Sequence, residues 1–171
     1  WGKWFRKIGI NYKTVQPVND VFIRDENRSN YWMAFSKHLQ SEDALVFIDP
    51  DTGLESGSPS YLRKAGREKY ILNNEIAHLY TLLDARSVLM IYQHLPMNKH
   101  IHEAAVKMKV EQLQSKSGGN LACAYRENDL AFIFVAKDLN LYRRLYGCLV
   151  AYHSTSQHPR KALYPMMSTK A

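Results

Sequence analysis

Residues 44–48 read Ala-Leu-Val-Phe-Ile, and residues 49–55, Asp-Pro-Asp-Thr-Gly-Leu-Glu, follow directly. An unbroken apolar run between charged residues is typical of a strand buried on both faces, as in a parallel sheet. Residues 87–92, Ser-Val-Leu-Met-Ile-Tyr, form a second such run. Between the runs lies a helical pattern whose apolar positions are Leu72, Ile76, Leu79 and Leu83. Strands joined by a crossover helix lie parallel, so the two runs are predicted to be neighbours in one sheet.

The pattern of alternating strands and helices extends in both directions from this unit. A helix is predicted over 28–40, with Trp32, Phe35 and Leu39 on its apolar face. A second is predicted over 99–116, with Ile101, Ala105, Met108 and Leu113 as its apolar stripe. Short apolar runs at 121–126 and 130–136 flank Glu127-Asn128-Asp129, which predicts an antiparallel hairpin. A helix from 138 to about 152 and an extended basic tail over 153–171 complete the chain.

These elements predict an α/β fold: a Rossmann-like, mainly parallel sheet with flanking helices and a C-terminal antiparallel hairpin. A length of 171 residues suits one domain, 1–171. The chain starts at Trp1 rather than at methionine, so we expect that an upstream N-terminal part precedes it. The first strand would then have an unpaired edge, which residues 1–23, upstream residues or a second copy in a homodimer would cover.

Composition favours a folded protein and gives a weak preference for polyanionic partners. Hydrophobic residues make up 46% and charged residues 23%, unlike a disordered chain. There is no apolar run long enough to cross a bilayer and no signal peptide pattern, so we expect a cytoplasmic protein with no membrane partner. A net charge of +7 favours nucleic acid as a partner. Cys123 and Cys148 lack metal-site spacing and are predicted to be buried thiols.

The residues that follow the two buried strands are the candidates for chemistry. In an open α/β sheet, ligands bind beyond the carboxyl ends of the strands. Asp49, Asp51 and His94 are therefore candidate catalytic residues, and Gln93 is a candidate substrate contact. His94 has the side chain of a general base, a ligand or a hydrogen-bond donor. The competing interpretation is that Asp49 caps a strand, Asp51 belongs to an Asp-x-Gly turn and His94 is a solvated loop residue.

Two further sets of side chains bear on substrate and metal binding. Asp49, Asp51 and Glu55 offer the oxygen ligands that Mg²⁺ prefers, which would make a metal site. The basic residues that follow the acidic strand end are candidates for holding phosphates over the site, as is a later residue at the end of a hairpin strand; they are Arg63, Lys64, Arg67, Lys69 and Arg126. A solvated basic face is the common alternative for such a patch.

The order of elements and the strand end resemble a known family. The segment from Phe47 to the end of the 130–136 strand looks like strands four to seven of class I S-adenosylmethionine-dependent methyltransferases. Members that methylate base amino groups end the fourth strand in Asp-Pro-Pro-Tyr; here Asp49-Pro50 match, while Asp51 and Thr52 differ. Uncharacterised bacterial proteins with an Asp-Pro-Asp-x-Gly-Leu-Glu strand end are more similar. The resemblance implies S-adenosylmethionine as cofactor, although the chain lacks the family's Gly-rich turn after a first strand.

Three functions are therefore open. The first is a methyltransferase-like enzyme domain acting on a polyanionic substrate, with Asp49 positioning the target atom and nucleic acid as the expected partner. The second is a Mg²⁺-dependent nuclease or phosphodiesterase that uses Asp49, Asp51 and Glu55. The third is a catalytically inactive Rossmann-like module that binds nucleic acid or a protein.

Overall fold

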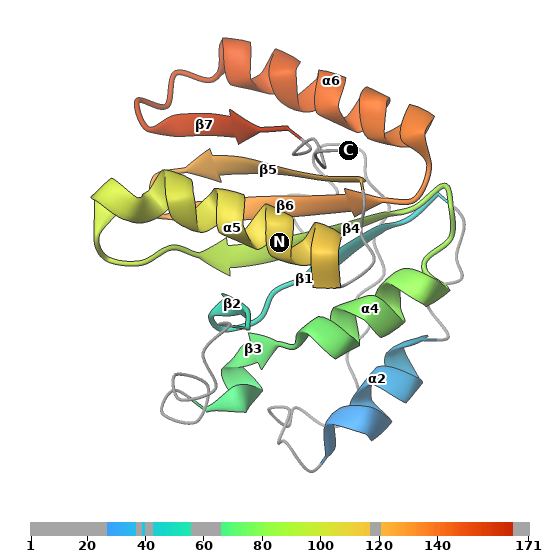
Figure 1. The fold of residues 1–171 in the computed structure, drawn as a ribbon. Coiled ribbons are helices and arrows are strands. Elements are labelled where there is room, and N and C mark those ends of the chain that lie inside the picture. The colour runs from blue at the N-terminus through green and yellow to red at the C-terminus, as the bar shows by residue number, and fades with distance from the viewer. Residues whose placement is uncertain (1–26, 37–38, 40–42, 56–65, 117–120, 166–171) are drawn as a thin grey trace, which may run out of the picture.

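The computed structural model describes residues 27–36, 39, 43–55, 66–116 and 121–165. These residues form a mixed α/β structure in which helices cover both faces of a five-stranded sheet (Figure 1). The sheet contains β1 (Leu45–Ile48), β4 (Val88–His94), β5 (Leu121–Glu127), β6 (Leu130–Ala136) and β7 (Lys161–Tyr164). The helices are α2 (Arg28–Ser36), η2 (Arg67–Lys69), α4 (Asn73–Leu82), η3 (Lys99–Ile101), α5 (His102–Lys116) and α6 (Leu139–Thr155). A small parallel pair, β2 (Gly53–Leu54) and β3 (Tyr70–Ile71), stands beside the main sheet.

The strand order in the main sheet is β1-β4-β6-β5-β7. The predicted parallel neighbours are confirmed, because β1 pairs with β4 in parallel, with Leu45 opposite Val88 and Ile48 opposite Ile91. The predicted hairpin of β5 and β6 is also confirmed. The expectation of a mainly parallel sheet is wrong for the described strands, since three of their four pairings are antiparallel. The reason is that β6 lies between β4 and β5 and runs antiparallel to both. β4 and β5 run in the same direction, but they are therefore not hydrogen-bonded to each other.

The predicted tail over 153–171 is replaced by ordered structure as far as residue 165. Helix α6 continues to Thr155, and β7 then pairs antiparallel with β5, with Tyr164 opposite Ala124. Tyr164 is buried in the core, which explains why this short segment adds to the sheet despite its basic neighbours. Residues 166–171 lie outside the described residues.

Two apolar layers hold the helices on the sheet. On one face, α4 and α5 pack against the sheet through buried residues such as Ile76 and Val110, and α2 contributes Trp32. On the other face, α6 packs over β5, β6 and β7 around Tyr142 and Phe134. The apolar faces predicted for the 28–40 and 72–83 helices are confirmed: the residues predicted for them are buried or packed against the core. Residues 37, 38 and 40 lie outside the described part.

The apolar stripe predicted for the 99–116 helix is wrong in phase. Of the four predicted residues, Leu113 is fully buried, but Ile101 is 44% and Met108 55% exposed. The buried positions of this region are His102, Val106, Lys109, Val110 and Leu113. The buried face of α5 includes Lys109 and His102. It was not recognised as apolar, because an analysis of sequence periodicity counts both residues as polar. Burial of a lysine stem is physically reasonable where its ammonium finds acceptors.

The two cysteines differ in environment. Cys123 is fully buried in the layer under α6, and burial raises the pKa of its thiol to about 12. Cys148 on α6 is exposed, which corrects the prediction that both thiols are buried. Neither forms a disulfide. Among the described helices there is none with the length and apolar character needed to cross a membrane.

Candidate functional site

The parallel pairing of β1 and β4 brings three side chains together at the carboxyl edge of the sheet. Phe47 lies opposite Met90, so Asp49 and Tyr92, each two residues further on, lie on the same side of the sheet. His94 lies on that side as well, because its ring contacts the Tyr92 ring at 5.0 Å between centroids. We call Asp49, Tyr92 and His94 the strand-end cluster. His94 was expected in a loop; it is instead the last residue of β4 and pairs with Leu130.

Electrostatic coupling within the cluster supports this proximity. Partial burial raises the pKa of the Asp49 carboxyl above its usual range, and the positive charge of a protonated His94 opposes that rise. Burial also raises the pKa of the Tyr92 hydroxyl, and the negative charge of Asp49 raises it further. A desolvated carboxylate is a stronger base and hydrogen-bond acceptor than one in water. Asp49 is still exposed to solvent, so a substrate can reach it.

An aromatic surface continues from the cluster along the sheet. Tyr92 contacts Phe132 of β6 edge to face, with centroids 5.5 Å apart. Both rings are only half-buried. A half-buried ring next to a carboxylate can contact a flat heterocyclic group that hydrogen-bonds to the carboxylate.

Gln93 points to the opposite side of the sheet and is buried. Its side-chain oxygen accepts from the Leu54 amide at 2.9 Å, and its nitrogen donates to the carbonyls of Thr52 and His94. Gly53 has φ +123°, and a Cβ at that position would meet the Gln93 amide at 2.5 Å. Gln93 therefore fastens the turn that follows Asp49 to β4. A direct contact of Gln93 with substrate remains a prediction.

The other two carboxylates of this region are directed to separate partners. Asp51 forms an exposed ion pair with Lys69, with 3.7 Å between the ammonium and the carboxylate, so Lys69 lies beside the acidic strand end. Glu55 accepts a hydrogen bond from the Asn73 side chain at the start of α4. Within the described residues there is no group of three or more His, Cys, Asp or Glu side chains arranged to hold a metal ion. A Mg²⁺ site remains a prediction of the nuclease alternative.

Lys109 of α5 is a buried cation that the sequence did not single out. Its ammonium donates to the carbonyls of Leu54 at 3.0 Å and Glu55 at 2.5 Å, and to the Gln112 side chain at 3.2 Å. Burial lowers the pKa of Lys109 to about 8, against the opposing charge of Glu55. All three ammonium hydrogens have acceptors, so Lys109 ties the end of β2 to α5. It is a positioning residue for the turn after Asp49.

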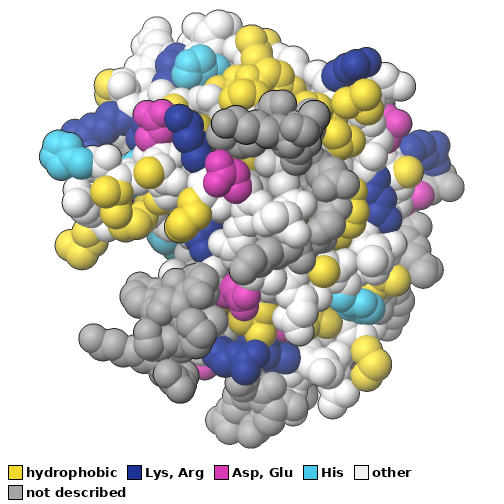
Figure 2. Space-filling model, in the orientation of Figure 1, with side chains coloured by type: hydrophobic (Ala, Val, Ile, Leu, Met, Phe, Trp, Pro, Cys, Tyr) yellow, Lys and Arg dark blue, Asp and Glu magenta, His cyan; other side chains and the backbone are white. Residues whose placement is uncertain are grey.

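The basic residues proposed as phosphate contacts do not form one described surface. Arg63 and Lys64 lie outside the described residues. Arg67 and Lys69 are exposed on η2. Arg126 donates to the Tyr164 hydroxyl and to the Asn128 carbonyl at the hairpin. Figure 2 shows Lys and Arg side chains in several separate places on one face, one group of them over η2 and β3.

No family model, curated protein or solved structure matches this chain. Its function is therefore inferred from its own residues.

Three structural residues near the site escaped the sequence interpretation. They are Arg28, Glu75 and Lys109, and none of them was a candidate site residue. In the structure Arg28 and Glu75 form a buried ion pair with Nε to Oε1 at 2.6 Å. The signal for Lys109 is its place in the row Val106, Val110 and Leu113, at helical spacing. No local pattern pairs Arg28 with Glu75, because they lie 47 positions apart.

Proposed function

We propose that this chain is a methyltransferase-like enzyme domain that acts on a polyanionic substrate, with nucleic acid as the favoured class. In this proposal, Asp49 accepts a hydrogen bond from the substrate atom that reacts. The observation that carries it is the strand-end cluster, in which a partly desolvated but solvent-accessible Asp49 carboxylate lies near His94 and Tyr92 at the carboxyl edge of two parallel strands. The order β1-β4-β6-β5 agrees with the C-terminal hairpin that the family resemblance implies, and β7 extends the sheet beyond it.

The cluster supplies the parts of an acid–base site. Asp49 would orient the reacting N–H or O–H group and draw on its proton, because burial makes the carboxylate more basic. His94 lies near enough for its charge to act on the Asp49 carboxyl, which makes it the second polar group of the proposed site. The rings of Tyr92 and Phe132 would support a flat substrate group. Lys69 and the net charge of +7 favour a substrate rich in phosphate.

S-adenosylmethionine comes into this proposal from the resemblance alone. Its family binds the cofactor where a Gly-rich turn opens onto the ligand. The resemblance assigns the described strands to positions four to seven of the family, so the turn that would hold the cofactor is not among the described residues. The steps described above therefore involve only this chain's own residues, and the methyl-transfer test decides whether the cofactor is used.

The test is transfer of a labelled methyl group from S-adenosylmethionine to mixed RNA and DNA. Wild-type protein is expected to label one of them, and Asp49→Asn to lower the rate by roughly 10²- to 10⁴-fold, the usual contribution of a positioned proton acceptor. Asp49→Asn should not destabilise the fold, because burial disfavours the charged carboxylate. Asp43→Asn is the matched control, since Asp43 is exposed at the opposite end of β1 and should retain the wild-type rate. Absence of label from both nucleic acids would remove the methyl-transfer proposal.

The nuclease alternative has a separate test, a Mn²⁺ titration followed by melting temperature. A metal that binds the folded state raises the melting temperature. We expect no rise for wild type, because Asp51 and Glu55 are directed to Lys69 and Asn73. Asp51→Asn is expected to change the free energy of unfolding by less than about 1 kcal/mol, as is usual for an exposed ion pair. A Mn²⁺-dependent rise that Asp51→Asn abolishes would instead favour the nuclease.

A further inference from the structure

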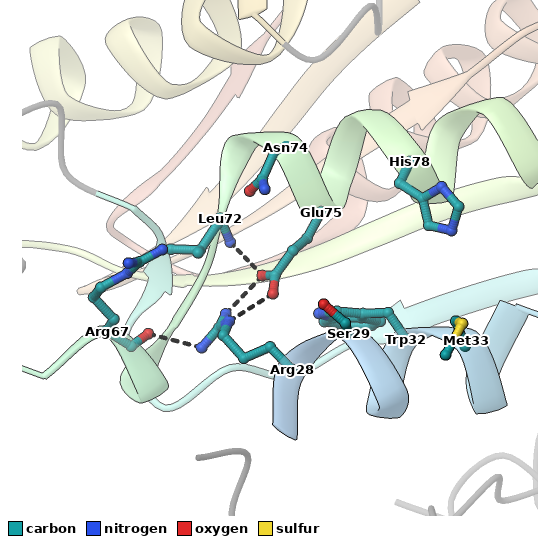
Figure 3. Close-up of a pocket in the computed structure, with 9 residues that line it drawn as sticks. All are labelled: Arg28, Ser29, Trp32, Met33, Arg67, Leu72, Asn74, Glu75 and His78. Atoms are coloured by element: carbon teal, nitrogen blue, oxygen red, sulfur yellow. Dashed lines mark hydrogen bonds and ion pairs between the residues drawn. The ribbon is translucent and has the colours of Figure 1, made fainter. Parts of the chain in front are cut away.

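A cavity of about 390 Å³ lies between α2, η2 and the start of α4. Figure 3 shows the side chains that line it: Arg28, Ser29, Trp32, Met33, Arg67, Leu72, Asn74, Glu75 and His78. None of them belongs to the strand-end cluster. Cavities of this size are typical of small-molecule sites. The cavity is therefore separate from the proposed active site.

A buried ion pair forms one wall of the cavity. Arg28 is 6% and Glu75 7% exposed, and the guanidinium contacts both carboxylate oxygens at 2.6 Å. Glu75 also accepts from the Leu72 amide, so both of its oxygens are engaged. Arg28 further donates to the carbonyls of Arg67 and Tyr70. These bonds occupy four of the five guanidinium N–H donors, which leaves one donor at this wall without a described partner.

Trp32 supplies a second donor that lacks a partner. Its side chain is 8% exposed, and its indole Nε1 has no hydrogen-bond acceptor among the described residues. In Figure 3 the nitrogen end of the ring is turned toward Glu75 and Arg28, among the lining residues. Burying a donor without an acceptor is unfavourable, so the position favours an occupant that brings an acceptor atom.

The charge around the cavity favours an anion. Leu72 precedes the first turn of α4 and has no polar side chain to cap it; Glu75 accepts from the Leu72 amide, and the described residues offer the following amides of that turn no side-chain cap. The positive end of the α4 dipole therefore lies at the cavity, where Leu72, Asn74 and Glu75 line it. The rim adds the cationic Arg67 and the imidazole of His78. Glu75 is the one carboxylate among the nine lining residues, and Arg28 neutralises it.

We propose that this cavity binds a phosphate monoester of mononucleotide size. The phosphate would accept from the Trp32 indole, from the remaining donor of Arg28 and from amides of the first α4 turn. The apolar side chains of Met33 and Leu72, with the face of Trp32, would contact the organic part. The cavity is larger than a bare oxyanion requires, which is why an organic group is included.

Calorimetric titration with adenosine monophosphate, adenosine and inorganic phosphate tests the site. We expect adenosine monophosphate to bind more tightly than either of the other two. Trp32→Phe keeps an aromatic ring and removes the N–H, so it should weaken binding of adenosine monophosphate by about 10-fold, the effect of one lost hydrogen bond to a charged group. Tyr80→Phe on α4 is the control, because Tyr80 packs against the same core and does not line the cavity.

Each other outcome overturns a defined part of the proposal. Equal affinity for inorganic phosphate and adenosine monophosphate would show that the cavity does not recognise the organic part of the ligand. Equal affinity for adenosine and adenosine monophosphate would show that it does not recognise the phosphate. Binding that Trp32→Phe leaves unchanged, or no binding at millimolar concentration, would reject the site. Trp32→Phe is expected to fold normally, since it removes a buried donor that has no partner. A wild-type melting temperature of the variant confirms that a loss of binding is local.

Discussion

Arg28→Ala is expected to lower the free energy of unfolding by about 3–5 kcal/mol, because it leaves the Glu75 carboxylate buried without its counter-ion. Both side chains are more than nine-tenths buried, and two of the guanidinium nitrogens contact the carboxylate at 2.6 Å. The same change removes the donors that the carbonyls of Arg67 and Tyr70 now accept. A loss of this size is a large part of the stability of an ordinary domain. Urea unfolding followed by circular dichroism measures it.

Two variants separate the ion pair from general damage to the helices. Lys107→Ala breaks the exposed pair between Lys107 and Glu103 on α5 and should leave the urea midpoint close to that of wild type. The double change of Arg28→Met with Glu75→Leu should recover much of the stability, because apolar residues of similar volume often replace a buried pair without loss. A midpoint for Arg28→Ala equal to that of Lys107→Ala would show that the buried pair contributes little.

The second large effect is a dependence of stability on alkaline pH that originates at Lys109. Burial lowers its pKa from an ordinary 10.5 to about 8 in the folded protein. Between these two values the unfolded chain binds more protons than the folded chain at this residue, so stability rises with pH across the window. Below pH 8 the folded state is destabilised in full by the buried ammonium. Above pH 10.5 Lys109 is neutral in both the folded and the unfolded state, so this destabilisation is gone. The lowered pKa corresponds to roughly 3 kcal/mol.

The measurement compares wild type with Lys109→Met at a series of pH values from 7 upward. The buried thiol of Cys123 acts in the opposite sense, because a pKa raised to about 12 makes stability fall as pH rises. Both proteins contain Cys123, so the difference between their unfolding free energies isolates Lys109. We expect the free energy of unfolding of wild type to rise relative to that of Lys109→Met as pH rises from 8 to 10.5. Parallel curves would show that the ammonium is not desolvated as its burial implies.

Much of the local structure could be predicted from the sequence. The apolar runs at 44–48 and 87–92 became adjacent parallel strands, and the Glu127-Asn128-Asp129 cluster became a hairpin turn with φ +54° at Asn128. The acidic strand end was correctly placed at the carboxyl edge beside His94. These features depend on residues that are close in sequence or joined by one crossover, which is the range over which periodicity and turn chemistry act.

The structural predictions failed where the pairing or packing of a segment depends on residues far away in the sequence. The segment after α6 gave no signal of β7, because its pairing depends on the free edge that β5 presents. The stripe of α5 was assigned to the wrong face because Lys109 is buried by carbonyl acceptors on β2, which lies 55 residues earlier in the chain.

By itself, the sequence determined the segments that form β1, β4, β5 and β6 and the helices between them, and that Asp49 follows the first strand of the described sheet. Apolar spacing within a segment fixes which of its faces avoids water, and that information is local. The tertiary structure alone decided that β6 separates β4 from β5, that Gln93 and Lys109 fasten the turn after Asp49, and that Arg28 meets Glu75. A polar group is buried only where a specific partner forms a hydrogen bond or ion pair with it. Here those partners come from segments far away in the sequence, and no local sequence pattern identifies them.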